Sequence, residues 1–266
     1  MIANFHTHTT FCDGKNTPEE VVLSAIQKGF SDIGFSGHGY TDFDLTYCIK
    51  DMDAYIREIN RLKEKYKNEI QVYTGIEEDA FCPVDRAKFD YILGSSHYLY
   101  VDEKYYPIDC GYDGFKKCLE LFRYDVVALA ESYYSAFCEY IQRRKPDIIG
   151  HFDLITKYEE MDDPLFLQNE KYNAVAEKYV AEAAKSGCVF ELNTGAIARG
   201  LRTSPYPSEN LLHILKELDA DIILSSDSHQ ADTVDFYFEE AKKYIKDIGF
   251  TRLVTLQDGK FIKYDI

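Results

Sequence analysis

The sequence predicts a single-domain α/β protein, residues 1–266, whose parallel sheet closes into a barrel of the TIM type with seven strand–helix units. Two observations lead to this prediction. Short apolar runs alternate with longer amphipathic segments along the chain, which is the pattern of parallel strands joined by right-handed helical crossovers. No Gly/Ser/Pro-rich linker, internal repeat or low-complexity tract divides the sequence. An open, doubly wound sheet fits the same alternation and is the alternative fold.

Seven short apolar runs are the predicted strands of this sheet. They cover Ile2–His8, Asp32–Gly37, Gln71–Glu77, Tyr91–Ser96, Asp147–His151, Cys188–Asn193 and Asp221–Ser226. Near the end of the chain, Leu253–Tyr264 is predicted to form a hairpin with its turn at Asp258-Gly259.

The segments between the strands place apolar residues at three- and four-residue spacing, which is typical of amphipathic helices. The predicted helices cover Thr17–Lys28, Asp53–Lys67, Gly114–Arg144, Lys171–Ser186, Ser208–Leu218 and Asp232–Ile248. The first has a strong start signal, because Thr17 is followed by Pro18 and then by Glu20 at the third helical position. Gly187 stands where a helix-ending glycine is expected. The Gly114–Arg144 segment is long enough to be two helices or one kinked helix.

Composition restricts the class of protein and its partners. The net charge is −16, so the chain repels a phosphate backbone and we expect no nucleic-acid partner. A small phosphate ester stays compatible, because bound metal ions reverse the local field. The seven cysteines occur without a CxxC pair, which favours reduced thiols and a cytoplasmic location. We expect no signal peptide and no membrane partner, since no run of about 18 apolar residues occurs. The sequence predicts no oligomeric state.

Ionisable side chains gather where the predicted strands end. They are His6, His8, Asp13, His38, Glu77, His97, His151, Asp227 and His229. Loops at the carboxyl ends of barrel strands converge on one opening, so we expect these residues to meet in space.

Their chemistry indicates a centre of several metal ions. Successive side chains of an extended segment point to opposite faces, so His6 and His8 project together, as do Asp227 and His229. Imidazole and carboxylate together suit Zn²⁺, Mn²⁺ and Fe²⁺, and the lack of thiolate argues against a structural zinc site. Nine ligands exceed what one ion needs, which indicates two or three ions with a bridging carboxylate.

Other ionisable residues have simpler interpretations. His213 lies in the middle of a predicted helix and is interpreted as an ordinary helix residue. Cys12 lies near the predicted site, but nothing beside it in the sequence lowers its pKa, so we do not expect a cysteine nucleophile. The neighbouring acids Glu78 and Asp79, like Asp162 and Asp163, are interpreted as solvated charges, with Asp79 also a candidate to orient a metal ligand.

These motifs, in this order, resemble the polymerase and histidinol phosphatase (PHP) superfamily. The resemblance covers nearly the whole chain through HTHTTFCDG, SGHGY, GIEED, GSSHYL, GHFDLI and SSDSH. It implies a distorted seven-stranded (β/α) barrel with two or three metals. By motif, His6, His8, Glu77 and Asp227 resemble the ligands of one metal. Glu77 then resembles a bridge to a second metal held by His97 and His151, and Asp13, His38 and His229 resemble the third set.

Within that superfamily the chain looks most like the monofunctional histidinol-phosphate phosphatases, on the stretches GHFDLITKY and ELNTGAIARGLRTSPYPSENLL. The second stretch places Arg199 and Arg202 on a loop expected at the rim. A guanidinium bonds two phosphate oxygens at once, so both are candidate substrate contacts, and Arg199 is favoured as the phosphate clamp. Tyr98 is a further candidate contact.

The resemblance therefore predicts a metal-dependent phosphomonoesterase that hydrolyses L-histidinol phosphate in histidine biosynthesis. We expect a metal-bridging hydroxide to attack phosphorus while a metal and Arg199 hold the other oxygens, with Asp13, His229 or a metal-bound water as the candidate proton donor. The alternatives are a phosphatase of the same superfamily acting on nucleotides, sugar phosphates or phosphotyrosine, a nucleic-acid proofreading module, and a non-catalytic metal-binding protein. The −16 charge opposes the proofreading module.

Overall fold

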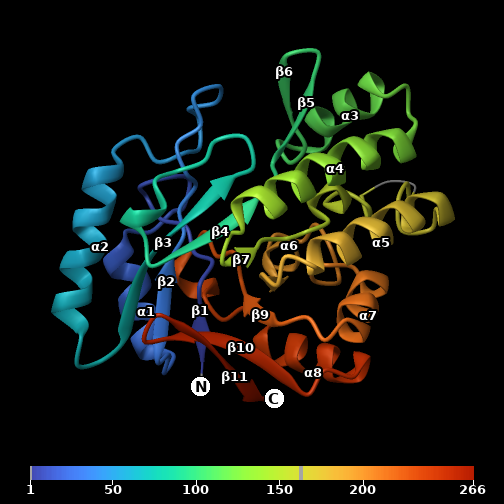
Figure 1. Ribbon diagram of the computed structural model, residues 1–266. Helices are drawn as coiled ribbons and strands as arrows, with labels where there is room; N and C mark the ends of the chain where they lie inside the picture. Colours follow the sequence, from blue (N-terminus) through green and yellow to red (C-terminus); the bar gives the residue numbers. More distant parts are fainter. Residues whose placement is uncertain (1, 162–163) are drawn as a thin grey trace.

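The structure is a computed structural model that describes residues 2–161 and 164–266, and its centre is one large sheet (Figure 1). The strand order is β1-β2-β3-β4-β7-β8-β9-β10-β11. These strands cover Ala3–Asn4 (β1), Asp32–Phe35 (β2), Gln71–Asp79 (β3), Tyr91–Ser95 (β4), Ile148–Ile149 (β7), Val189–Asn193 (β8), Ile222–Ser225 (β9), Arg252–Gln257 (β10) and Lys260–Asp265 (β11). Neighbours from β1 to β10 are parallel, and β11 is antiparallel to β10.

The parallel α/β sheet is confirmed, whereas the closed seven-stranded barrel is not. All seven predicted strands are present in chain order, but the predicted hairpin adds β10 and β11 beyond β9. The first strand is much shorter than predicted, because beyond Asn4 side chains replace part of the ladder: the Thr7 hydroxyl donates to Gly34 O at 2.8 Å. A parallel bridge then joins Thr7 to Ser228, which follows β9.

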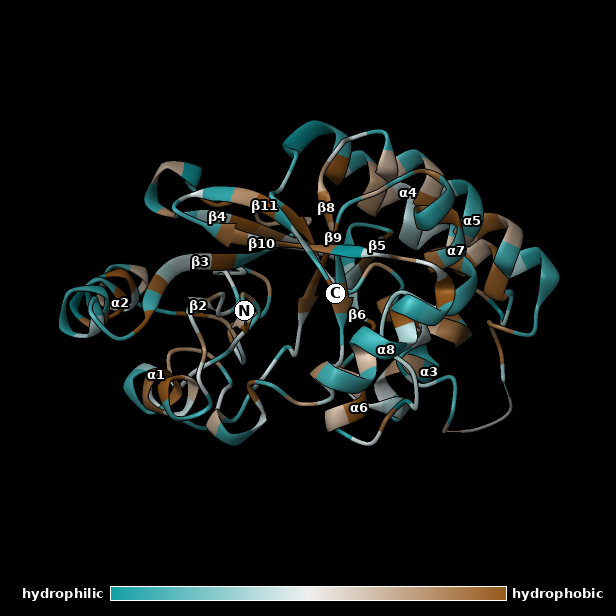
Figure 2. Cartoon of the chain, turned by 90° about the horizontal axis from the view of Figure 1, so that it is seen from below, coloured by the Kyte–Doolittle hydropathy of each residue, from teal (hydrophilic) through white to brown (hydrophobic). Residues whose placement is uncertain are grey.

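Helices surround the sheet (Figures 1 and 2). They cover Pro18–Gln27 (α1), Met52–Tyr66 (α2), Tyr112–Leu121 (α3), Val126–Arg144 (α4), Glu170–Ala184 (α5), Gly195–Ala198 (α6), Glu209–Glu217 (α7) and Phe238–Ile248 (α8), with short 3₁₀ turns at Arg86–Lys88, Leu154–Thr156 and Ala231–Thr233. The helices α1 and α2 lie beside β1–β3, and α4, α5 and α7 form a layer on the other side (Figure 2).

Local sequence signals explain most helix boundaries. Thr17 caps α1 in a reciprocal capping box with Glu20, as predicted. The long Gly114–Arg144 segment is two helices, because Arg123 and Tyr124 adopt positive φ and Asp125 then caps α4 through its side chain. The last helix begins at Phe238, later than the predicted Asp232, after a 3₁₀ turn.

Two hairpins flank the sheet. The β10–β11 hairpin turns at Asp258 and Gly259, both with positive φ, as predicted. A second hairpin, formed by Tyr98–Val101 (β5) and Lys104–Pro107 (β6), was not predicted. It follows β4 and projects at the top of Figure 1, on the edge where the site lies.

The core has two parts. The larger cluster packs the helices against the sheet. The smaller cluster joins Phe5, which follows β1, to Tyr91 of β4, Ile148 of β7 and Val254 of β10. Side chains from strands far apart in the sheet order meet there, so the sheet must curl around this cluster. The rings of Phe5 and Tyr91 meet edge to face at 5.8 Å, which stabilises the curl.

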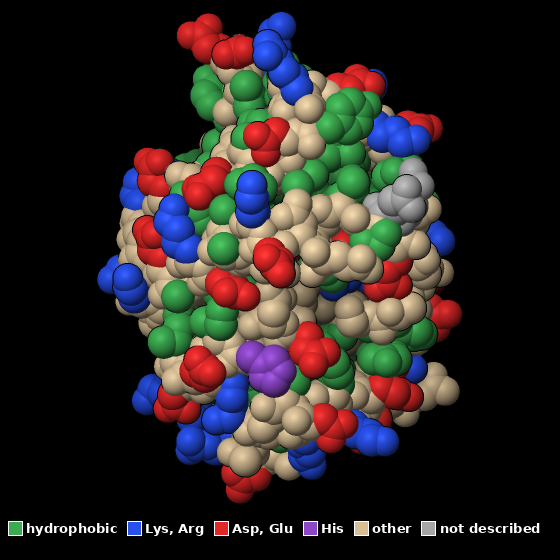
Figure 3. Space-filling view, turned by 90° about the vertical axis from the view of Figure 1, so that its right-hand side faces the viewer, with side chains coloured by type: hydrophobic (Ala, Val, Ile, Leu, Met, Phe, Trp, Pro, Cys, Tyr) green, Lys and Arg blue, Asp and Glu red, His purple; other side chains and the backbone are tan. Residues whose placement is uncertain are grey.

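In the parts of the chain that are described, no helix is long and apolar enough to cross a bilayer. On the side where α5 and α7 lie, acidic and basic side chains are intermixed (Figure 3).

Candidate metal centre

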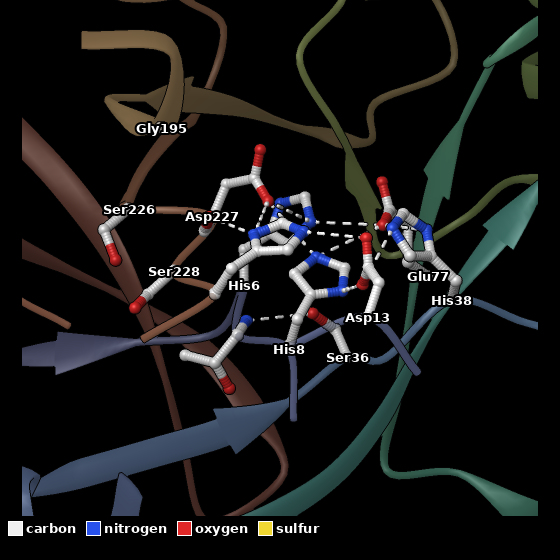
Figure 4. Close-up of polar contacts among 12 residues, drawn as sticks. His6, His8, Asp13, Ser36, His38, Glu77, Gly195, Ser226, Asp227 and Ser228 are labelled. Carbon is white, nitrogen blue, oxygen red and sulfur yellow. Dashed lines mark hydrogen bonds and ion pairs between the residues drawn. The ribbon is translucent and has the colours of Figure 1, made fainter. Parts of the chain in front are cut away.

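All nine predicted ligands meet at the carboxyl ends of the strands. His6 and His8 follow β1, Glu77 lies in β3, and the other histidines and Asp227 follow β2, β4, β7 and β9. Their side chains point toward one another in Figure 4, which draws His6, His8, Asp13, His38, Glu77 and Asp227 together. Most are buried, whereas the Asp13 and His229 side chains keep 36% and 24% of their surface exposed. These two therefore mark the open side of the centre.

Glu77 lies in the middle of the cluster, with both carboxylate oxygens engaged. Its Oε1 is 3.2 Å from His97 Nε2 and 3.1 Å from His151 Nε2. Its Oε2 is 2.9 Å from His38 Nδ1 and 3.3 Å from His6 Nε2. A carboxylate placed between histidines on two sides is the arrangement that a bridging ligand requires.

Asp227 and Asp13 complete the cluster. Asp227 Oδ1 is 3.2 Å from His8 Nε2 and 3.5 Å from His6 Nε2. Asp13 Oδ2 is 3.3 Å from His229 Nε2, and its Oδ1 is 3.7 Å from His38 Nε2. Four groups place their ligand atoms within 4.8 Å of one another: His8/Asp13/His38/His229, His6/Glu77/His151, His6/His8/Asp227 and His38/Glu77/His97.

Unpartnered polar atoms test whether these residues fit divalent cations. His6 Nε2, His8 Nε2 and Glu77 Oε2 are fully buried, and none of their contacts, including the 2.9 Å contact between Glu77 Oε2 and His38 Nδ1, has the geometry of a hydrogen bond. Buried polar atoms rarely stay unpaired, because desolvation costs free energy that nothing returns. These three atoms face one another at 3.3–3.5 Å. Their imidazole and carboxylate chemistry fits Zn²⁺, Mn²⁺ or Fe²⁺.

Two further carboxylates orient the histidines, and the sequence analysis identified only one of them. Asp79 Oδ2 is 3.2 Å from His97 Nδ1, so the opposite nitrogen faces Glu77. Glu191, in the middle of β8, is 2.6 Å from His6 Nδ1 and also accepts from the His151 backbone N at 2.7 Å. A carboxylate on the outer nitrogen of a metal-binding histidine fixes its ring and leaves the inner nitrogen free to bind.

The electrostatics favour bound positive charge. Burial would lower the pKa of His6, but the nearby carboxylates, Glu191 and Glu77 foremost, raise it well above its usual value. Burial would raise the pKa of Glu77, yet the surrounding histidines, beginning with His6, hold it well below its usual range. Burial and the neighbouring ring of His229 lower the pKa of His8 to about 3, so His8 is neutral at pH 7. Metal cations can replace the protons that balance such carboxylates.

Arg199 reaches the centre, whereas Arg202 does not. Arg199 Nη2 is 2.9 Å from Asp227 Oδ2, and the guanidinium keeps 31% of its side-chain surface exposed. The expected open position of Arg202 at the rim is wrong. Arg202 is 3% exposed, stacks on the Tyr206 ring and donates to Thr156 and Ser208. Its guanidinium ties the loop after β8 to the segment after β7.

The hollow over the centre has two adjoining chambers, which share four of their lining residues. The metal-side chamber, of about 240 Å³, is lined by ligands together with Lys157 and Arg199. The side chamber, of about 210 Å³, is lined by Asp44, Tyr47 and Tyr98, among others. Asp13, His38, His97 and Asp109 line both. Lys157 and Asp109 were not predicted as site residues, although Lys157 lies within the stretch GHFDLITKY; Asp109 lies in a loop outside the recognised motifs.

The remaining acids, histidine and cysteine that the sequence singled out differ in how far the structure agrees with their interpretation. Glu78 and Asp79 are buried rather than solvated. Glu78 accepts hydrogen bonds from Arg144 Nε and Nη2, each at 2.7 Å. Asp162 and Asp163 lie outside the described residues. His213 lies on α7, 3.7 Å from Glu209, as an ordinary helix residue. Burial raises the pKa of Cys12 to about 11, which keeps it a thiol.

Comparisons with known proteins agree with this architecture. The family model of the PHP domain matches residues 4–195. A Schizosaccharomyces pombe protein named "Probable histidinol-phosphatase" is 28% identical over 282 residues, covering 97% of this chain and 90% of the relative. The histidinol-phosphatase of Bacillus subtilis is 25% identical, covering 88% of this chain and 96% of the relative. The fold is also that of Lactococcus lactis histidinol phosphate phosphatase, solved with Zn, L-histidinol and phosphate, at TM-score 0.74, 21% identity and 98% coverage of both chains.

Proposed function

This chain belongs to the PHP domain family, and on that premise we propose that it is a metal-dependent phosphomonoesterase that hydrolyses L-histidinol phosphate to L-histidinol and phosphate. The observation that carries the proposal is the cluster of buried, unpartnered imidazole and carboxylate atoms that face one another at the strand ends. The choice of substrate is supported by the full-length relatives, which are named as histidinol-phosphatases.

The ligand set is part of the proposal. His6, His8, Glu77 and Asp227 would hold one ion, Glu77 with His97 and His151 a second, and Asp13, His38 and His229 a third. Two or three ions of Zn²⁺, Mn²⁺ or Fe²⁺ suit these ligands. When bound, such ions acidify water and neutralise charge on a phosphoryl group.

The chain itself supplies two cations for the phosphoryl group. Arg199 and Lys157 line the metal-side chamber. Asp227 aligns the Arg199 guanidinium from one edge, and the exposed part of the side chain can present N–H donors to phosphate oxygens. Lys157 Nζ is 3.5 Å from Asp109, a distance at which it remains available to an incoming anion. Both cations stabilise the charge that spreads over the phosphoryl oxygens during transfer. Arg202 is assigned no contact with the substrate.

The leaving oxygen needs a proton, and the Asp13–His229 pair is placed to provide it. These side chains keep the most exposed positions of the cluster, with His229 Nε2 3.3 Å from Asp13 Oδ2. With two ions bound, Asp13 and His229 are free of metal, and a proton held between these two atoms can pass to an alkoxide that leaves through the open side.

Three broader features are also proposed. The Thr7–Ser228 bridge and the curled inner cluster support a distorted barrel closed on the side that carries the metals. We also propose that residues 1–266 are a single domain, of which the described parts, 2–161 and 164–266, surround this site. The seven unpaired cysteines support a reducing, cytoplasmic compartment.

Substrate competition tests the proposal. We expect enzyme reconstituted with Mn²⁺, Zn²⁺ or Fe²⁺ to prefer L-histidinol phosphate over p-nitrophenyl phosphate, AMP and phosphotyrosine by at least roughly a hundredfold in kcat/KM, about 2.7 kcal/mol of transition-state binding. Equal rates on every ester would remove the substrate assignment, and no metal-dependent hydrolysis of any ester would remove the phosphatase assignment.

Matched histidine variants locate the activity. We expect His8→Ala to abolish metal-dependent hydrolysis, because it removes a buried atom that faces Asp227. His213→Ala makes the same change on the exposed face of α7 and should leave the rate unchanged. Equal activity in the two variants would contradict the proposed site.

A further inference from the structure

We infer that the side chamber is a subsite for a cationic leaving group, in which Asp109 binds an ammonium next to the ester and Asp44 binds a second polar, cationic group farther out. The inference rests on the proposed function and deepens it, because it assigns to particular residues the preference for a cationic phosphate ester over a neutral one.

The two chambers differ in their basic residues, although Asp13 and Asp109 line both of them and Asp227 lines the metal-side chamber. The metal-side chamber is lined by the cations Arg199 and Lys157, which suit a phosphoryl group. Neither Lys nor Arg is among the residues that line the side chamber, where Asp44 and Asp109 lie beside the rings of Tyr47 and Tyr98. A ligand that spans both chambers is therefore expected to carry a negative group at the end beside Arg199 and Lys157. Its other end meets carboxylates and aromatic rings, which suit a cationic group.

Asp109 lies at the junction of the chambers, since it lines both of them. Although burial would raise the pKa of Asp109, Lys157 and the site histidines lower it, so the carboxylate is charged at neutral pH. Its ion pair with Lys157 is long, at 3.5 Å, and its side chain keeps 29% of its surface exposed. The carboxylate can therefore accept a further donor.

Asp44 lies away from the junction, because it lines only the side chamber, and it is held in place from two segments. Its Oδ1 accepts from the backbone N and the hydroxyl of Thr46, and its Oδ2 accepts from the Tyr98 hydroxyl at 2.9 Å. Phe43 stacks on Tyr105 of β6 at 3.7 Å, which joins the loop that carries Asp44 to the β5–β6 hairpin. The wall is thus preorganised before a ligand enters.

The spacing of groups in L-histidinol phosphate matches this order. Its ammonium is on the carbon next to the ester-bearing carbon. Its imidazole is joined to that same ammonium-bearing carbon through one CH₂ group. With the phosphoryl group in the metal-side chamber, the ammonium lies at the junction beside Asp109 and the imidazole extends toward Asp44 and the tyrosine rings. Nucleotides, sugar phosphates and phosphotyrosine esters within a peptide carry no ammonium at that position.

The test combines two substrates with three variants. The substrates are L-histidinol phosphate and 3-(imidazol-4-yl)propyl phosphate, which has the same three-carbon chain with hydrogen in place of the ammonium. The variants are Asp109→Asn, Asp44→Asn and Asp42→Asn. Asp42 is an exposed aspartate on the same loop as Asp44 and is outside the set of residues that line the chambers. Its variant is the control for the loss of one negative charge.

We expect the wild-type enzyme and Asp42→Asn to prefer the ammonium-bearing ester by roughly ten- to a hundredfold in kcat/KM, the range of one charged hydrogen bond. Asp109→Asn should lose that preference, and Asp44→Asn should keep it while both rates fall. Calorimetric binding of L-histidinol, which involves no hydrolysis, should weaken in Asp109→Asn by a similar factor. If Asp109→Asn keeps the wild-type preference, or the wild type has none, the inference is overturned.

Failure of the proposed substrate is a separate outcome. If the wild type hydrolyses L-histidinol phosphate no faster than p-nitrophenyl phosphate, that substrate assignment fails. Phosphoethanolamine and ethyl phosphate then provide the test, because they differ only in the ammonium. A preference for phosphoethanolamine that Asp109→Asn removes would support the cationic subsite with another substrate, and no preference would overturn it.

Discussion

Replacing Glu191 by Gln should weaken metal binding without changing any predicted ligand. The buried Glu191 carboxylate accepts from three donors: His6 Nδ1 at 2.6 Å, the His151 backbone N at 2.7 Å and Asn193 Nδ2 at 2.9 Å. A carboxamide has one acceptor oxygen, and its NH₂ group can only donate. At least one of the three donors must then face another donor.

Each orientation that the new carboxamide can take in Glu191→Gln has a defined cost. If its NH₂ group faces His6, the ring must move its proton to Nε2, the atom that faces Glu77, and cannot bind a metal there. If it faces His151 N, a buried N–H is left unpaired. We expect a loss of about 1–3 kcal/mol in the free energy of unfolding and a roughly 10- to 100-fold loss in metal affinity, as found for carboxylates behind metal-binding histidines.

A matched variant separates the two effects. Glu159 is also buried and accepts from three backbone N–H groups, those of Leu165, Phe166 and Leu167, but it contacts no predicted ligand. Glu159→Gln should lose similar stability in urea unfolding and keep its affinity for Mn²⁺ or Zn²⁺ in a chelator competition. Equal metal affinities for Glu191→Gln and Glu159→Gln would refute the reasoning.

Two further predictions concern metal removal and packing. In the folded protein without metal, the pKa values of His6, His38 and His97 are raised. Their protonated rings therefore stabilise the fold fully below the pKa of about 6.5 that histidine has in the unfolded chain. In EDTA this stabilisation is lost as the pH rises through the folded-state pKa. The Tm in EDTA should therefore fall with rising pH in that range, and scanning calorimetry on metal-loaded protein should show no such fall; equal slopes would count against the site. Gly75→Ala would drive a methyl group into the Tyr91 ring and should cost about 1–3 kcal/mol in urea unfolding, whereas wild-type stability would show that the ring can move.

The sequence predicted that these side chains cluster in space because strand ends can be recognised in it. His97 and His151 both follow apolar runs, and the parallel topology brings the ends of those strands together at one edge of the sheet. Glu191 was not predicted because it lies inside such a run, although a glutamate in a buried strand is itself a signal of a polar partner. Arg202 was misplaced because its partners, Thr156 and Ser208, come from separate segments, and only tertiary packing brings them together.

The turn residues explain why the β10–β11 hairpin was predicted from the sequence and the β5–β6 hairpin was not. The β10–β11 turn has Gly259 at a positive-φ position, which is a recognisable sequence signal. The β5–β6 turn places Asp102 and Glu103 at positive φ instead, without glycine or asparagine. Its sequence therefore lacked the usual signal, so the hairpin was not predicted, although its Tyr98, which lines the side chamber, was a candidate substrate contact.

Three consecutive acids on β3 make this strand intolerant of insertions and deletions. Glu77 and Asp79 point toward the site histidines, whereas Glu78 between them points to Arg144 of α4. Because side chains alternate along a strand, adding or removing one residue before them would exchange the two faces. Glu78 would then enter the cluster and Glu77 would face the helix layer. We expect natural length variation around β3 to fall in the loops at its two ends and not within the strand. We also expect the Glu78–Arg144 pair to favour the correct register while the sheet assembles.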